Sequence, residues 1–254
     1  MERLLGRTAF ITGAGSGFGA GIAKAFCQEG ASVVVADLDA AAAHKMADAL
    51  CADGGTAFGV GVDITNRDSL DAGIAFCREN LGSLNTLVAN AGIGQRPVSI
   101  SDTTANELTR QFETNSIGVV QSCQAALAAL RDAQDPSIVI TVSGIALVPR
   151  PQLYGYGMAK AAAAYFMKSL ALELAPERIR VNGLFPAVGQ TPMLAEFAGG
   201  KLDEGDAATF ADALPLGRLI TPEDVGHAAV YLASPKEAAT VTGCALPVDS
   251  GRCI

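Results

Sequence analysis

The chain has 254 residues, of which 50% are apolar and 17% charged, so it can bury a large core and is too apolar for disorder. Its net charge is -8 and its basic residues form no stripe, which argues against a nucleic-acid partner. We expect no membrane-spanning helix, because no run of about 18 apolar residues occurs. The N-terminal segment lacks an apolar stretch followed by a cleavage site, so we expect a cytoplasmic protein.

The cysteine and histidine content limits the available chemistry. The six cysteines form no C-x-x-C pair, which argues against zinc ribbons and thioredoxin-type redox motifs, and we interpret them as buried free thiols. The two histidines, His44 and His227, are interpreted as structural. Without further histidines, a Ser-His-Asp hydrolase or a histidine-rich metal site is hard to build, and we expect no metal.

Short β-branched runs alternate with helical stretches along the chain. Taken in order, the predicted elements are the strand Thr8–Ile11, helix Phe18–Gln28, strand Ser32–Asp37, helix Asp39–Cys51, strand Ala57–Val62, helix Asp68–Leu81, strand Thr86–Ala89, helix Asn106–Arg131, strand Ser137–Val142, helix Leu153–Leu174, strand Ile179–Leu184, helix Pro222–Ala233 and strand Ala245–Val248. Continuously apolar strands are buried on both faces, as in parallel sheets. The alternation predicts an α/β fold: a single domain over residues 1–254 with a Rossmann-like, doubly wound parallel sheet of about seven strands and helices on both faces.

One irregular insertion, at about 191–214, interrupts this alternation and contains Pro192 and three glycines. It follows the sixth strand, at the carboxyl ends of the strands, where sheets of this kind bind ligands. We interpret it as a substrate lid, with an idle surface loop as the alternative.

A glycine-rich turn, TGAGSGFG over residues 12–19, lies directly between the first strand and the first helix. Glycines at such a turn allow positive φ and let the backbone approach a pyrophosphate, which then sits at the helix N-terminus. The position of the turn between strand and helix therefore indicates a dinucleotide site.

Asp37 ends the second strand, 18 residues beyond Gly19. Its carboxylate can accept both ribose hydroxyls of an adenosine and would repel a 2′-phosphate, for which neither Ser16 nor Leu38 supplies a cation. This favours NAD over NADP, with capping of the next helix as the alternative role. Asp63 ends the third strand in the same way and is placed to reach the adenine edge.

Tyr156 and Lys160 are spaced i and i+4 on a predicted helix and so share a face. The nearby ammonium is expected to lower the pKa of the phenol, which starts near 10, and to make Tyr156 a usable acid or base. No other tyrosine of the chain has lysine at i+4. Ser143, at the end of the fifth strand, can hold the same substrate oxygen.

Together these residues resemble the short-chain dehydrogenase/reductase family over nearly the whole chain. The family's motifs occur in order as Thr12–Gly19, Asn90-Ala91-Gly92, Asn115, Ser143, Tyr156 with Lys160, Asn182–Thr191 and Asp249-Ser250-Gly251. Two positions depart from the usual pattern. Ala89 replaces the common Asn, and Ala187 replaces the glycine that usually follows Pro186, so we expect a slightly different backbone beside the nicotinamide.

The resemblance implies hydride transfer between a nicotinamide and a secondary alcohol or ketone, a small-molecule substrate. Tyr156 would exchange the proton, Lys160 would lower its pKa and bind the nicotinamide ribose, Ser143 would orient the substrate oxygen, Asn115 would hold a water linking Lys160 to solvent, and Thr191 would contact the carboxamide. The expected NAD contacts are Gly13, Ser16, Gly17, Phe18, Gly19, Asp37, Leu38, Asp63, Ile64, Asn90, Ala91, Gly92, Tyr156, Lys160, Pro186, Val188 and Thr191. The expected substrate contacts are Gln95, Ser143, Ile145, Tyr154 and Met193.

The family commonly forms oligomers, and the alanine-rich segments Ala125–Leu130 and Ala159–Leu174 favour a homotetramer through close helix packing. Two other functions stay open. Reduction of 3-oxoacyl thioesters is disfavoured by Asp37, because reductive biosynthesis usually draws on NADPH, and by the scarcity of basic residues to hold an acidic carrier. A catalytically silent cofactor sensor is disfavoured by the complete catalytic set. Arg96 and Arg150 could meet an anionic group or could simply be solvated.

Overall fold

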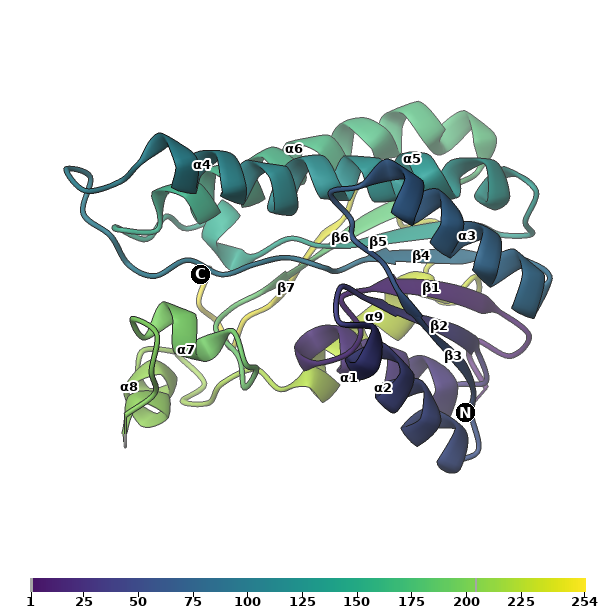
Figure 1. The fold of residues 1–254 in the computed structure, drawn as a ribbon, viewed down its shortest axis with the longest axis horizontal. Coiled ribbons are helices and arrows are strands. Elements are labelled where there is room, and N and C mark those ends of the chain that lie inside the picture. Colours follow the sequence, from purple (N-terminus) through teal and green to yellow (C-terminus); the bar gives the residue numbers. More distant parts are fainter. Residues whose placement is uncertain (1, 204) are drawn as a thin grey trace.

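A seven-stranded parallel sheet forms the centre of the molecule (Figure 1). The computed structural model describes residues 2–203 and 205–254, and the strand order is β3-β2-β1-β4-β5-β6-β7. The strands are β1 (Thr8–Thr12), β2 (Ser32–Asp37), β3 (Thr56–Gly61), β4 (Thr86–Ala89), β5 (Ser137–Thr141), β6 (Arg180–Pro186) and β7 (Ala245–Val248). The predicted doubly wound, single-domain α/β fold is thereby confirmed.

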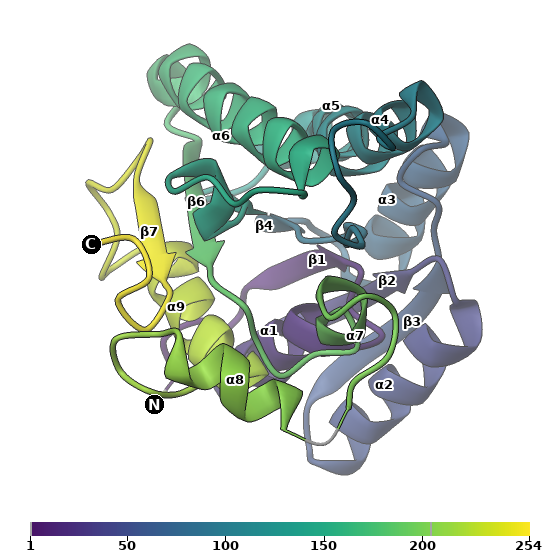
Figure 2. The same ribbon diagram turned by 90° about the vertical axis from the view of Figure 1, so that its left-hand side faces the viewer.

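Helices cover both faces of the sheet, as Figures 1 and 2 show. One layer contains α3 (Arg67–Leu81), α4 (Ala105–Phe112), α5 (Gly118–Arg131) and α6 (Tyr154–Leu174), and the other α1 (Gly17–Gln28), α2 (Ala40–Ala52) and α9 (Pro222–Ala233). Side chains alternate between the layers along each strand. In β2, for example, Val34 and Ala36 join one core while Val33 and Val35 join the other. Of the helices in the described ranges, none is long and apolar enough to cross a membrane.

The helix predicted over Asn106–Arg131 is broken into α4, a π-helical turn at Glu113–Ile117, and α5. Two adjacent buried polar residues account for the break. The Asn115 side chain bonds to the main chain of Ile93, while the Ser116 hydroxyl donates to the carbonyl of Ala159 in α6. Single π-helical turns of this kind occur frequently at functional sites.

The insertion at 191–214 contains two short helices, α7 (Leu194–Phe197) and α8 (Asp206–Asp212), where we expected an irregular segment; its residue 204 lies outside the described residues. Leu194, Leu214 and Leu219 form a small apolar cluster of their own beneath it. Figure 2 shows both helices in front of the carboxyl ends of the strands. The apolar cluster explains why the segment folds back on the domain.

The cysteines are free thiols, as expected, but their burial differs from the expectation. Cys77 and Cys123 are buried, and burial raises the pKa of each thiol to about 12. Cys51 is exposed, because it lies on the outward face of α2 near its end.

Helices α1 and α9 touch through glycines. A β-carbon on Gly21 would overlap the carbonyl of Pro222, and one on Gly226 would lie 2.7 Å from the carbonyl oxygen of Gly21. The capping box at Thr221 and Asp224 fixes the start of α9 at this contact. Close backbone packing therefore holds α1, whose N-terminus follows the glycine-rich turn.

Replacing Gly21 with alanine should destabilise the fold by about 1–3 kcal/mol, because the new methyl group overpacks the helix contact. Gly157→Ala in α6 is the control, since its β-carbon would meet Ile145 at an ordinary 3.7 Å. There the usual helix preference for alanine should stabilise by up to about 1 kcal/mol. Urea unfolding of both variants measures the difference, and equal effects would contradict the packing argument.

Candidate functional site

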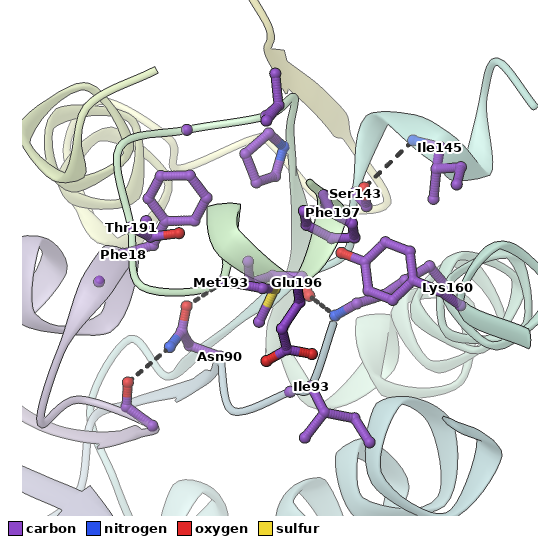
Figure 3. Close-up of a pocket in the computed structure, with 18 of the residues that line it drawn as sticks. Phe18, Asn90, Ile93, Ser143, Ile145, Lys160, Thr191, Met193, Glu196 and Phe197 are labelled. Carbon is purple, nitrogen blue, oxygen red and sulfur yellow. Dashed lines mark hydrogen bonds between the residues drawn. The ribbon is translucent and has the colours of Figure 1, made fainter. Parts of the chain in front are cut away.

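A cavity of about 880 Å³ lies at the carboxyl ends of the strands, between the sheet and the insertion (Figure 3). Every predicted cofactor contact except Gly19 lines it. Gly19 lies behind the turn, where a β-carbon would overlap the carbonyl of Gly13. The cavity thus joins the glycine-rich turn and the Tyr-Lys pair, which are far apart in sequence.

The glycine-rich turn is shaped to bring backbone N–H groups to an anion. Gly13 has φ of +63°, and a β-carbon there would lie 2.7 Å from Ala91. Ser16 occupies the N-cap of α1 but its side chain makes no capping bond. The first turn of α1 therefore keeps free N–H groups facing a cavity, the arrangement that binds phosphate.

Asn90 holds three strand ends together at this turn. Its side-chain amide donates to the carbonyls of Thr12 (3.0 Å) and Gly13 (3.1 Å), and its oxygen accepts from the Thr141 hydroxyl (3.0 Å). The Thr12 hydroxyl in turn accepts from the main chain of Asn90 and Ala91. The ends of β1, β4 and β5 are therefore locked in one arrangement.

The Asp37 carboxylate faces the cavity and accepts from the N–H groups of Gly15 (2.9 Å) and Asp39 (3.0 Å). The next helix is capped by Asp39, which accepts from Ala41 and Ala42, so capping by Asp37 is excluded. Asp63 also lines the cavity, with one oxygen bonded to Thr65. Two carboxylates at the ends of β2 and β3 fit the hydroxyls and amine of an adenosine and offer no charge partner to a 2′-phosphate.

Tyr156 and Lys160 lie buried in α6 on the face that lines the cavity. The Lys160 Nζ atom donates to the carbonyl of Thr141 (2.9 Å) and lies 5.9 Å from the centre of the Tyr156 ring. Ser143, just after β5, acts through its side chain on the Tyr156 hydroxyl, whose pKa it lowers, and accepts from the N–H of Ile145 (3.3 Å). The predicted grouping of these three side chains is therefore present.

The expected lowering of the Tyr156 pKa is wrong for this structure. Burial raises the pKa of Tyr156 to about 12, a change opposed by the Ser143 bond and reinforced by the Glu196 carboxylate. The insertion contributes to this burial, since the Phe197 ring packs edge-on against Tyr156 with centroids 5.3 Å apart. Burial also lowers the pKa of Lys160 to about 8.

Asn115 does not line the cavity. Its amide oxygen accepts from the N–H of Ile93 (3.1 Å), and its nitrogen donates to the Ile93 carbonyl (2.9 Å) and to Gln111 (2.6 Å). Gln111 also donates to the carbonyl of Gly94 (2.7 Å). Because its side chain is committed to these partners, Asn115 positions the segment after β4, and the expected water-holding role does not fall to its amide.

Two predicted substrate contacts, Gln95 and Tyr154, lie outside the cavity lining, whereas Ser143, Ile145 and Met193 line it. Buried Gln95 accepts from the N–H of Tyr156 (2.7 Å). Helix α6 has no side-chain cap at its N-cap residue, so Gln95 satisfies one of its first N–H groups instead. It supports the helix turn that carries Tyr156.

Sequence reasoning did not single out several residues of the site, among them Gln111, Thr141, Glu196 and Phe197. The last two belong to α7, whose weak helical signal is hidden between glycines and Pro192. Thr141 acts partly through its main-chain carbonyl, which any residue would provide. Gln111 carries no recognisable motif, and its position in the chain gave no signal.

Comparison with known proteins gives consistent matches over the whole chain. A family model described as Enoyl-(Acyl carrier protein) reductase matches residues 13–252. The chain is 38% identical over 246 residues to 4-formylbenzenesulfonate dehydrogenase TsaC1/TsaC2 of Comamonas testosteroni, covering 97% of each chain. It is 35% identical over 250 residues to cis-4-hydroxycyclohexanecarboxylate dehydrogenase of Sinomonas cyclohexanicum, covering 98% of each.

Solved structures agree with these matches. The crystal structure of a 3-ketoacyl-(acyl-carrier-protein) reductase from Brucella melitensis, complexed with NADH, has a TM-score of 0.89 and 37% identity. The alignment covers 99% of this chain and 100% of that one. The fold is therefore shared with a protein that was solved in complex with NADH.

Lys160→Met should stabilise the fold at neutral pH by up to about 3 kcal/mol, because the buried ammonium has a lowered pKa and is unfavourable in the folded state. The folded chain binds fewer protons than the unfolded chain between about pH 8 and 10.5, so wild-type stability rises over that range and the advantage of the variant fades.

Urea unfolding at several pH values tests this prediction. Lys168→Met, on the exposed side of the same helix, is the control and should show little change at any pH. A Lys160→Met variant that is less stable than wild type at neutral pH would contradict the reasoning.

Proposed function

This chain belongs to the short-chain dehydrogenase/reductase family, and we propose that it is an oxidoreductase transferring a hydride between NAD(H) and a secondary alcohol or ketone. One observation carries the proposal: Tyr156, Lys160 and Ser143 line the same cavity as the glycine-rich turn and Asp37. The turn fits a pyrophosphate and Asp37 fits an unmodified ribose, so the residues present fit NAD.

A bound nicotinamide supplies or accepts the hydride. Tyr156 exchanges a proton with the substrate oxygen, and Ser143, whose side chain acts on the Tyr156 hydroxyl, orients that oxygen. Lys160, fixed by the Thr141 carbonyl, supplies positive charge beside the phenol and binds the nicotinamide ribose. Thr191, which lines the cavity after β6, contacts the carboxamide.

The pKa values bear on the direction of proton transfer. Because the pKa of Tyr156 is raised to about 12, the phenol is protonated at neutral pH and is ready to donate to a carbonyl oxygen. Oxidation of an alcohol instead needs the phenolate. Moving Phe197 and Glu196 away from Tyr156 removes part of the burial and a negative charge, and both changes lower its pKa.

We assign the segment at 191–214 as a lid over the substrate. Met193, at the N-cap of α7, and Glu196 and Phe197, within α7, lie in the cavity wall, and Figure 3 shows these side chains beside Lys160. Gly199 and Gly200 follow α7 with positive φ, and their adaptable backbones suit a hinge. A closed lid excludes water from the Tyr156 hydroxyl.

The relatives' names support oxidation or reduction at a C–O centre. One name describes a ring-bound secondary hydroxyl and another a formyl group. Reduction of 3-oxoacyl thioesters remains the second candidate, because the Brucella melitensis reductase carries that activity in its name. That protein was solved with NADH, so a preference of this chain for NAD would not exclude the activity.

A homotetramer is proposed from an exposed apolar stripe on α6. Met158, Tyr165 and Leu172 recur every seven residues on its outer face, where Tyr165 is 77% and Leu172 80% exposed. The alanines Ala126, Ala129, Ala159 and Ala163, on which the sequence argument relied, are buried within the subunit. Large exposed apolar side chains in one stripe indicate a protein–protein contact.

Tyr156→Phe should retain cofactor binding and lose roughly two to four orders of magnitude in kcat, the usual worth of general acid–base catalysis. Lys160→Ala should lose a comparable amount and also bind the cofactor more weakly. Tyr154→Phe, two residues away and outside the cavity lining, is the matched control and should stay active. Steady-state assays and fluorescence titration with NADH measure both properties. Full activity in Tyr156→Phe would contradict the role of Tyr156, whereas cofactor binding without any turnover in the wild-type chain would leave a cofactor-sensing protein as the better explanation.

The wild-type chain should prefer NAD to NADP, because the Asp37 carboxylate repels a 2′-phosphate and no cation lies beside Leu38 among the described lining residues. Asp37→Ala should weaken NAD and reduce the discrimination. The ratio of kcat/KM for the two cofactors measures both effects. A wild-type preference for NADP would contradict the assignment of Asp37.

The particle mass in solution should be near four times the chain mass of 25.9 kDa. Light scattering at micromolar concentration measures this mass directly. Tyr165→Glu combined with Leu172→Glu should dissociate the assembly, because it places charges at the centre of the stripe. A wild-type mass of one chain would refute the oligomer.

A further inference from the structure

Two arginines and an aromatic ring form one wall of the cavity. Arg150 comes from the loop between β5 and α6, Arg252 follows β7, and Phe210 lies in α8. The Phe210 ring centre lies 5.5 Å from the Arg150 guanidinium carbon, a cation–π contact that orients the guanidinium. Because β7 and β3 are opposite edges of the sheet, this wall lies across the sheet from the strands that carry Asp37 and Asp63.

Neither guanidinium has a partner of opposite charge. In the part of the chain that the structure describes, Arg150 and Arg252 donate no side-chain hydrogen bond and pair with no carboxylate. Most other arginines do have partners. Carboxylates pair with Arg3, Arg67, Arg78, Arg131 and Arg218, and main-chain carbonyls accept from Arg7 and Arg180.

The two guanidinium groups also repel each other. Burial lowers the pKa of Arg150, and the charge of Arg252 lowers it further. Glu196, an acid of the cavity lining, has a charge that acts on Tyr156 and a side chain that lies against Gly94. In a chain of net charge -8, two unpaired arginines that share a cavity wall form a site for an anion that is not part of the chain.

We propose that Arg150 and Arg252 bind the anionic group, a carboxylate or sulfonate, of the alcohol or ketone substrate, whose oxidised or reduced carbon lies at Tyr156. The planar guanidinium offers paired donors that match such groups. This inference rests on the proposed function for the identity of the ligand, while the charge arrangement stands independently of turnover.

Binding of an unreactive probe tests the site without catalysis. Cyclohexanecarboxylate and cyclohexanecarboxamide have similar shape, differ in charge and carry no hydroxyl to oxidise. Titration calorimetry of the protein saturated with NADH should give a Kd for the carboxylate about tenfold or more below that for the amide, as expected for charge-assisted bonds. Arg150→Gln with Arg252→Gln should remove the difference and leave the amide Kd unchanged.

Arg78→Gln is the control, since it removes the same charge on the surface, where Arg78 pairs with Asp132, and it should leave the tenfold preference intact. Circular dichroism checks that each variant is folded. Equal affinity for the two probes, or a preference that persists in the double variant, overturns the proposal.

Measurements of turnover distinguish a failure of this inference from a failure of the proposed function. NADH formation should be faster with 4-hydroxycyclohexanecarboxylate than with its amide, with the ratio of kcat/KM falling at least tenfold in the double variant. Carboxylate binding without oxidation of any alcohol would refute the proposed function and keep the anion site. Oxidation of both substrates with equal kcat/KM would refute the anion site and keep the proposed function.

Discussion

The site depends on one side-chain amide, that of Asn90. Its bonds to the Thr12 and Gly13 carbonyls and to the Thr141 hydroxyl fix the ends of β1, β4 and β5 relative to one another. The glycine-rich turn leaves from β1, and the Thr141 carbonyl that holds Lys160 ends β5. A partly buried amide that uses both its donor and its acceptor groups specifies a single arrangement, because any shift leaves one of them unpaired.

Three further side-chain amides, those of Gln95, Gln111 and Asn115, support the reacting groups without lining the cavity themselves. Gln95 completes the first turn of α6 under Tyr156, and Asn115 with Gln111 fixes the segment after β4. Gly92 leaves room for this set, because a β-carbon there would lie 2.5 Å from the Asn115 oxygen. The result is a rigid floor beneath a cavity whose roof is the short helix α7. The hydrogen-bonded side chains below the cavity are rigid and helix α7 above it is adaptable. This combination suits a site that must hold its cofactor while it admits substrate.

The fold could be predicted from the sequence because each strand is a short apolar run and each helix has a clear boundary. Val33 to Ala36 alternate between two cores, and such a pattern reads directly as a buried parallel strand. The glycine-rich turn and the strand-end carboxylate at the cavity were also predictable, because glycines and a strand-end carboxylate have few other reasons to occur in that order. The spacing of motifs in the sequence, however, does not indicate how deeply a side chain such as Tyr156 is buried. The direction of the Tyr156 pKa shift depends on burial, to which Phe197 contributes only in the folded chain.

The same limit explains the misassigned amides. Gln95 lies near the motif residues in sequence, and only the structure shows that it bonds to the main chain of Tyr156. The π-helical turn at Glu113–Ile117 was likewise hidden, because its cause is a pair of contacts to residues 22 and 43 positions away. Local sequence patterns predict the helices and strands well. Which face of a helix or strand is functional is decided by long-range polar contacts.

The separate apolar cluster of Leu194, Leu214 and Leu219 has a consequence for how such a protein diversifies. The roof of the cavity carries its own small core and shares few side chains with the two cores that hold the sheet together. Sequence change in the roof can therefore alter shape and charge above Tyr156 while the nucleotide-holding floor keeps its stability. A chain built in this way can evolve new substrate ranges by exchanging one segment. Recombination of the segment at 191–214 between relatives in the laboratory would use the same boundary.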